Sequence, residues 1–186
     1  MLAGITTREL LTATGTAIAV ALILRIFVVG VFSIPSHSME HTLRVGDHVL
    51  VSKLAYVFTP PIHGDVIVFT LPDSLRGSST DEAYIKRVIG VGGDTVLLNR
   101  YGITINGALQ PAPPQSAAMS PLPYGERSII VPRGYLFVLG DNRSNSWDSR
   151  YWGFLPLDHV VGRAVAIAWS TSDTTLHWDR LLRRID

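Results

Sequence analysis

Cysteine is absent from this 186-residue chain. Its absence excludes disulfide bonds, thiol nucleophiles and cysteine-based zinc sites. Charge is also scarce, because charged residues make up only 17% of the chain and the formal net charge is +1. Nucleic-acid-binding proteins usually carry a basic excess on one face, so we expect no nucleic-acid partner. Apolar residues make up 47% of the chain, which is enough for a packed core and excludes a disordered chain.

A long apolar run, Leu10–Phe32, contains a single charged residue, Arg25. About 20 residues in a helix, at about 1.5 Å each, span about 30 Å, the thickness of a bilayer core. The run is longer than the apolar part of a cleavable signal peptide. Thr12, Thr14 and Thr16 leave a buried core helix as the alternative. We expect one N-terminal transmembrane helix, whose orientation the flanking positive charges do not decide.

The chain beyond this run has the pattern of short β-strands, which are rich in β-branched residues and bounded by Gly, Pro or Asp. Asn106–Gly107 predicts a two-residue hairpin turn within Tyr101–Ala108. The expected strands are Val45–Lys53, Asp65–Phe69, Tyr84–Val91, Thr95–Leu98, Gly134–Leu139 and Val160–Trp169.

These patterns predict a mostly β protein with an antiparallel β-sheet domain. Residues 1–32 form the N-terminal tail and transmembrane anchor, and residues 33–186 form the β-domain. Within it, a small inserted β-subdomain covers about 94–132 and ends in a proline-rich segment that cannot form interior strands. The C-terminal apolar residues recur at helical spacing, with arginines on the other side, which predicts a short basic helix. That helix either lies at the membrane surface or packs on the β-domain.

Two serines in alternation, Ser36 and Ser38, are a candidate pair of nucleophile and oxyanion-stabilising hydroxyl. The six histidines are scattered, and none has an evident acidic partner in the sequence. The chain has only two lysines, Lys53 and Lys86, and arginine cannot act as a base. Lys86 lies inside an apolar strand, where burial can lower the pKa of its amine from about 10.4 to near 8. A serine–lysine pair would therefore use Lys53 or Lys86 as its base.

The run Gly140–Arg150 follows an apolar strand and is dense in hydrogen-bonding side chains. Its Asp and Asn residues predict a tight turn network, in which Asp148 and Arg150 can form an ion pair. Calcium binding is the alternative. The run lacks the later Glu of an EF-hand, however, and its two arginines oppose a cation.

Taken together, these segments resemble the type I signal peptidases. All of the motifs occur in the order of that family, behind an apolar N-terminal run. The matching segments are Phe32–Met39 followed by Thr42–Leu43, then Gly64–Phe69, then Tyr84–Arg87 with Gly90 and Gly93–Asp94, and finally Gly140–Arg150.

The resemblance implies a role for each matching catalytic position. Ser38 would attack the scissile carbonyl, and Lys86 would take its proton. The Ser38 N–H and the Ser36 hydroxyl would form the oxyanion hole, at about 3 kcal/mol per donor. Ser146 would hydrogen-bond Lys86 and orient it. The supporting residues Asp148 and Arg150 would brace the site.

The resemblance also implies the substrate and its location. An extended preprotein segment would place small side chains in shallow pockets near Ile34, Pro35, Tyr84 and Ile85, which accounts for cleavage after Ala-X-Ala. The expected partners are the signal peptides of preproteins and membrane lipid, and we expect a monomer. The expected location is the cytoplasmic (inner) membrane, crossed once, with the catalytic domain on the extracytoplasmic side. No metal or organic cofactor is implied, because a Ser/Lys dyad needs neither.

Three positions depart from the family pattern. His41 stands where proline is usual, Ser144 where an acidic residue or asparagine is common, and His63 where a basic residue often precedes glycine. None of them removes a proposed catalytic group.

Two other readings compete with the resemblance. A self-cleaving repressor-type protease shares the dyad but needs a DNA-reading domain, whereas this N-terminus is an apolar run. A membrane-tethered protein that binds signal peptides without cutting them is the other alternative, and the intact Ser38 and Lys86 argue against it. A cleavage assay separates these possibilities.

Overall fold

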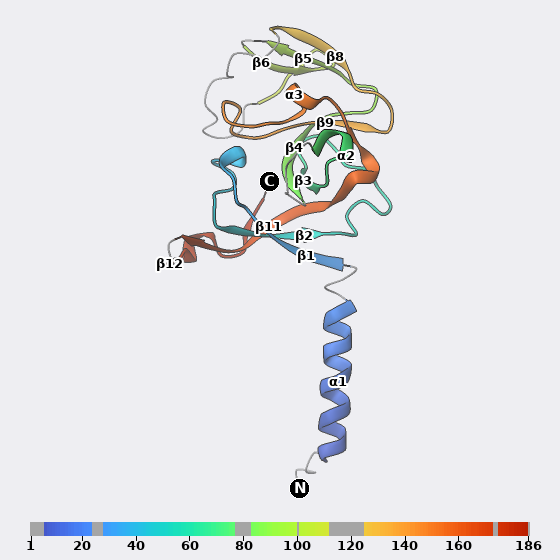
Figure 1. Cartoon of the computed structure of the whole chain (residues 1–186), viewed down its shortest axis with the longest axis vertical. Coiled ribbons are helices and arrows are strands. Elements are labelled where there is room, and N and C mark those ends of the chain that lie inside the picture. The colour runs from blue at the N-terminus through green and yellow to red at the C-terminus, as the bar shows by residue number, and fades with distance from the viewer. Residues whose placement is uncertain are drawn as a thin grey trace.

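The computed structural model describes residues 6–23, 28–76, 83–99, 101–111, 125–172 and 175–185. The N-terminal helix α1 (Thr7–Ile23) projects from the rest of the molecule as a separate stalk (Figure 1). Among the described residues, no helix is both long enough and apolar enough to cross a membrane. Residues 24–27, which include Arg25, lie outside the described residues.

The apolar run that we expected to form one helix as far as Phe32 is divided instead. The helix ends at Ile23, and strand β1 occupies Val29–Ser33. This strand pairs antiparallel with β2 (Asp47–Ser52), with Val31 opposite Leu50. The segment is rich in valine, which favours an extended backbone, and the free edge of β2 offers it a complete hydrogen-bond ladder. The end of the expected anchor is therefore part of the β-domain.

In the described part of the chain the main sheet has nine strands, and its central path runs in the order β1-β2-β11-β3-β4-β9-β10. All of its pairings are antiparallel. The remaining strands are β3 (Val66–Phe69), β4 (Tyr84–Val91), β9 (Tyr135–Leu139), β10 (Leu155–Pro156), β11 (Val160–Ser172), β12 (Thr175–Leu176) and β13 (Arg183–Arg184). These bounds confirm the mostly β, antiparallel class that the sequence predicts.

A second sheet, with four strands among the described residues, lies at the end of the molecule opposite α1, in the order β7-β6-β5-β8 (Figure 1). Its strands are β5 (Thr95–Asn99), β6 (Gly102–Ile105), β7 (Ala108–Leu109) and β8 (Arg127–Ile130). The turn between β6 and β7 has positive φ at Asn106 (50°) and Gly107 (85°), as the predicted hairpin turn requires. The proline-rich segment 112–124 lies outside the described residues.

A polar contact joins the two sheets where the chain passes from β4 to β5. His63 Nε2 lies 2.6 Å from Asp94 Oδ2, and Asn106 Nδ2 donates to Asp94 Oδ1 at 2.7 Å. Burial would raise the pKa of Asp94, but the hydrogen bonds from His63, the Val91 N–H and Asn106 outweigh it and lower that pKa. His63, one of the departures from the family pattern, therefore has a structural partner.

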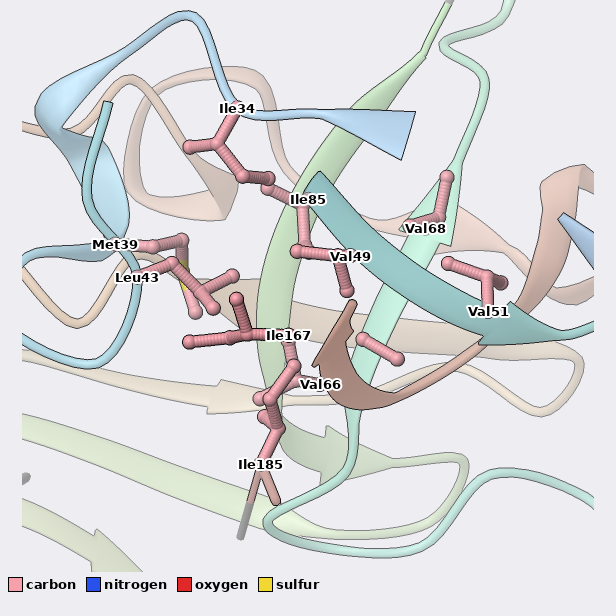
Figure 2. Packing of buried hydrophobic residues seen from close by; sticks show 11 residues of the cluster. Ile34, Met39, Leu43, Val49, Val51, Val66, Val68, Ile85, Ile167 and Ile185 are labelled. Atoms are coloured by element: carbon pink, nitrogen blue, oxygen red, sulfur yellow. The ribbon is translucent and has the colours of Figure 1, made fainter. Parts of the chain in front are cut away.

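The core that positions the site lies between the main sheet and the segment after β1. Figure 2 shows Met39 and Leu43 packed beside Ile167, with Ile34 near Ile85. Two further clusters fill the space around β9 and beneath the small sheet. The segment that carries the serines is thus held on a rigid apolar base.

The C-terminus does not form the basic helix that the apolar spacing predicts. A single 3₁₀ turn at Trp178–Arg180 is followed by β13, which pairs with β11. The helical interpretation placed Arg180 on the solvent side, but its guanidinium is buried and pairs with the buried Asp47 carboxylate. Ile185 belongs to the same core cluster as Met39 and Leu43 and lies near Val66 (Figure 2). Of the apolar residues in this pattern, Ile185 is buried, whereas Trp178, Leu181 and Leu182 are exposed. The C-terminus therefore packs on the β-domain through Arg180 and Ile185, and not through an apolar helix face.

Candidate active site

The two serines lie where the chain leaves β1 and turns over the core. Ser36 has extended backbone angles, and His37–Met39 form one 3₁₀ turn. The Ser36 and Ser38 hydroxyl oxygens are 3.3 Å apart. The Ser38 side chain faces a cavity but is nearly covered, with 8% of the residue exposed. The turn thus brings both hydroxyls to one face, as the alternation in sequence predicts.

Lys86 reaches Ser38 from the middle of β4. Its Nζ donates to Ser38 Oγ at 2.8 Å and to the Ile85 carbonyl at 3.0 Å. Only 5% of Lys86 is exposed. Burial lowers the pKa of the Lys86 amine to about 8, although the charges of Asp148 and Asp141 oppose the shift. A neutral amine is therefore accessible near neutral pH, in direct contact with a serine hydroxyl.

The loop Gly140–Arg150 packs under the two side chains. Arg150 Nε and Nη2 donate to the two carboxylate oxygens of Asp148, each at 2.8 Å, so the ion pair predicted from the sequence is present. The Gly140 N–H donates to Asp148 Oδ2 at 3.1 Å. This buried pair ties the end of β9 to the short helix α3 (Ser149–Trp152).

Ser146 does not make the hydrogen bond to Lys86 that the resemblance implies. Its Oγ is buried and has no hydrogen-bond partner in the described part of the chain. The hydroxyl occupies the space beside the Gly140 backbone, where a Cβ on residue 140 would lie 2.2 Å from it. Ser146 therefore borders the site, while the Nζ of Lys86 is bound by Ser38 and a backbone carbonyl.

A second network, which the sequence did not reveal, connects this loop to the serine segment. Thr42 Oγ1 donates to Asp141 Oδ2 at 2.6 Å, and Arg87 Nε donates to Asp141 Oδ1 at 2.8 Å. Arg87 and Thr42 are in the motifs quoted above, but nothing in their spacing shows that they share one carboxylate. The network joins three segments that are far apart in the chain.

A cavity of about 790 Å³ opens beside the two serines and Lys86. All four residues expected to bind substrate line it, namely Ile34, Pro35, Tyr84 and Ile85. The lining residues to which the sequence reasoning gave no binding role are Phe32, Ser33, His37, Val68, Ala83, Asn145 and Trp147. Trp147 and Tyr84 form an aromatic contact with ring centroids 6.4 Å apart. The cavity is therefore mainly apolar, and its polar lining residues include Ser36, Ser38 and Lys86.

The loop carboxylates that a cation would need are already paired with arginine, Asp141 with Arg87 and Asp148 with Arg150. In the described residues, no three acidic or histidine side chains gather as metal ligands would. The pairing disfavours the calcium alternative for this loop.

Comparison with known proteins gives matches to signal peptidases. A family model described as "Signal peptidase, peptidase S26" matches residues 7–169. A signal peptidase I from Leptolyngbya laminosa is 43% identical over 157 residues, which cover 83% of this chain and 76% of that protein. A probable signal peptidase I-2 from Synechocystis sp. is 37% identical over 154 residues, covering 83% of this chain and 69% of that protein.

Among solved structures, a signal peptidase I from Enterococcus faecalis is 28% identical and has a TM-score of 0.44. The match covers 56% of this chain and 97% of that one. This score is too low to support a shared fold by itself, so the assignment depends on the family model and the sequence relatives. On that basis the chain is a serine endopeptidase and belongs to the signal peptidase family, peptidase S26.

Proposed function

We propose that this enzyme removes signal peptides from exported preproteins by means of a Ser38–Lys86 dyad. The observation that carries the proposal is the 2.8 Å hydrogen bond from Lys86 Nζ to Ser38 Oγ. Lys53, the only other lysine, does not line the cavity. Lys86 is therefore the base that the geometry supports.

In the first half of the reaction, the neutral Lys86 amine accepts the Ser38 proton as Oγ attacks the scissile carbonyl carbon. The carbonyl oxygen becomes an oxyanion, which the Ser38 N–H and the Ser36 hydroxyl stabilise. The tetrahedral intermediate collapses when the C–N bond breaks, and Lys86 returns the proton to the leaving amine. The products are an acyl-enzyme on Ser38 and the mature protein with a free N-terminus.

In the second half, Lys86 accepts a proton from a water molecule that attacks the acyl carbon. The second tetrahedral intermediate breaks the C–Oγ bond, and the proton passes to Ser38. The signal peptide leaves with a free carboxylate. Each half moves one proton onto Lys86 and off again, so the amine must be neutral at the start of both.

We infer selectivity for small residues from the walls of the cavity. Ile34 and Ile85 are almost fully buried, with 3% and 8% of each residue exposed. Their side chains leave shallow apolar space beside Ser38, which favours alanine at the residue before the cut and at the third residue before it. An extended substrate segment presents these two side chains on one face, because strand side chains alternate.

We further propose that the enzyme acts as a monomer at the cytoplasmic membrane. The apolar N-terminal run would anchor it in a single pass, with the catalytic domain on the extracytoplasmic side. The family match begins at residue 7, within α1, which supports a shared role for this segment. The proposed nucleophile, base and pocket all belong to one chain, which supports a monomer.

The test is cleavage of a preprotein with an Ala-X-Ala site by the detergent-solubilised full chain. We expect cleavage at that site by the wild type and by Lys53→Ala, which removes the other lysine. Ser38→Ala and Lys86→Ala should lower the rate by at least about 10³-fold. Binding of the preprotein without cleavage by the wild type would favour the binding-protein alternative. Near-normal cleavage by either dyad variant would overturn the assignment of that residue.

A further inference from the structure

Asn142 contacts the main chain on both sides of Ser38. Its backbone N–H donates to the Ser38 carbonyl at 3.0 Å, and its side-chain Nδ2 donates to the His37 carbonyl at 3.1 Å. From the sequence, Asn142 was expected only to take part in a turn within its own loop. One residue of that loop instead holds both peptide units that flank the proposed nucleophile.

Ser144 sets the orientation of the Asn142 side chain. Its hydroxyl donates to Asn142 Oδ1 at 3.1 Å. Because the amide oxygen accepts this bond, the amide nitrogen is the group that faces the His37 carbonyl. An ionised carboxylate at position 144, where the family often has an acidic residue, would have no hydrogen to donate. The departure at Ser144 thus has a defined partner in this chain.

The His37–Ser38 peptide unit is the one that would supply the backbone donor to the oxyanion. In a trans peptide the C=O and N–H bonds point in opposite directions. Holding the His37 carbonyl toward Asn142 therefore directs the Ser38 N–H to the opposite side. Within the described residues, that N–H donates to no acceptor. It is free to bind a developing negative charge.

We propose that Asn142, oriented by Ser144, is a positioning residue that fixes the Ser38 N–H as an oxyanion donor. This proposal rests on the proposed function, since it assumes that Ser38 attacks a carbonyl. A donor that is already in place stabilises charge in the transition state without reorganising at that moment. A peptide unit that can rotate would lose this advantage, while the substrate-binding walls remain unchanged.

The experiment measures kcat and KM for the full-length enzyme on the Ala-X-Ala preprotein, together with the pH dependence of kcat/KM. Loss of an entire oxyanion donor typically costs about 10²–10³-fold in kcat. For Asn142→Ala, which loosens the donor, we expect a fall in kcat of about 10–100-fold, with KM within about threefold of wild type. The pH midpoint should stay at the wild-type value, because Lys86 is unchanged.

Ser144→Ala provides a milder second variant at an exposed position, in case Asn142→Ala folds poorly. We expect it to lower kcat by about 2–10-fold, less than Asn142→Ala, since it weakens only the orientation of the amide. The double variant should be no slower than Asn142→Ala alone, because Ser144 acts through Asn142. The matched control is Asn99→Ala. Asn99 Oδ1 accepts from the Tyr101 and Gly102 N–H groups in the small sheet, and its loss should leave kcat unchanged.

Three results would overturn the proposal: a kcat within twofold of wild type in Asn142→Ala, an effect confined to KM, or a displaced pH midpoint. If Asn142→Ala does not fold, an unchanged kcat in Ser144→Ala overturns it as well. Failure of the wild type to cleave would instead reject the proposed function. The variant kinetics therefore test the role of Asn142, whereas wild-type cleavage tests the proposed function.

Discussion

Lys86 Nζ lies 2.8 Å from Ser38 Oγ, and both residues are almost fully buried. Lys86 comes from β4 and Ser38 from the turn after β1, 48 residues apart in the chain. The two carboxylates whose charges act on the Lys86 amine, Asp141 and Asp148, are each paired with an arginine. Burial therefore dominates the electrostatics of the amine, which is the condition a lysine base requires.

The pH dependence of kcat/KM should report the Lys86 amine. Burial lowers its pKa to about 8, and only the neutral form can accept the Ser38 proton. Activity should therefore rise about tenfold per pH unit below this midpoint and level off above it. Steady-state rates between pH 6 and 10 measure the curve. A profile that is flat through this range would contradict a lysine base.

Lys86→Met should abolish cleavage and yet stabilise the fold near neutral pH. The amine has a pKa of about 8 in the folded state, against about 10.4 in the unfolded chain, so the unfolded state binds the proton more tightly. The wild type consequently loses stability as pH falls from about 10.4 to 8, and the cost stays constant below that. We expect Lys86→Met to gain up to about 3 kcal/mol at pH 7, with the gain shrinking toward pH 10. Denaturant unfolding at both pH values measures it, and a gain independent of pH would refute the linkage.

Gly140→Ala should inactivate the enzyme through sterics alone. A Cβ at this position would lie 2.4 Å from the Ser38 carbonyl oxygen and 2.2 Å from Ser146 Oγ. The Ser38 backbone must move to accommodate it, and a displacement of about 1 Å costs about 10²-fold in rate. Gly15→Ala is the matched control, because nothing lies within 4 Å of its added methyl group. Equal activities of the two variants would show that the Gly140–Arg150 loop can shift to accommodate the methyl group while Ser38 stays in place.

The C-terminal segment should be needed for stability because of Arg180. Its guanidinium and the Asp47 carboxylate are both buried, and the pair fixes the end of the chain beneath β2. Arg180→Met leaves a buried charge without its partner, so we expect a loss of about 3–5 kcal/mol of unfolding free energy. Adding Asp47→Leu should recover part of that loss. Thermal and denaturant unfolding measure both variants, and a double variant no more stable than Arg180→Met would argue against the pair.

Much of the β architecture follows from local patterns in the sequence. The buried strand β4 and the Asn106–Gly107 turn were predicted because period, β-branching and turn residues all agree there. The strand at Val29–Ser33 was missed because its apolar residues continue directly from those of α1. Composition alone does not separate a membrane helix from a β-strand in such a run.

The site was predictable only in part. The residues alone limited the candidates to two serines and two lysines, whereas the roles of Ser38 and Lys86, like the pocket residues, came from the resemblance. The contacts of Asp141 with Thr42 and Arg87 depend on strand register and loop packing, which leave no periodic signal. The resemblance placed Ser146 on Lys86, and the helical spacing placed Arg180 away from the apolar face, whereas Ser146 borders Gly140 and Arg180 is buried.

The most direct test of a Lys86 base is to observe its amine titrate. The chain has only two lysines, so a sample with isotope-labelled lysine side chains gives two NMR signals that Lys86→Ala can assign. The signal lost in that variant should titrate with a midpoint near 8 and should match the midpoint of kcat/KM. A Lys86 signal that titrates near the ordinary lysine value of about 10.4 would contradict the account.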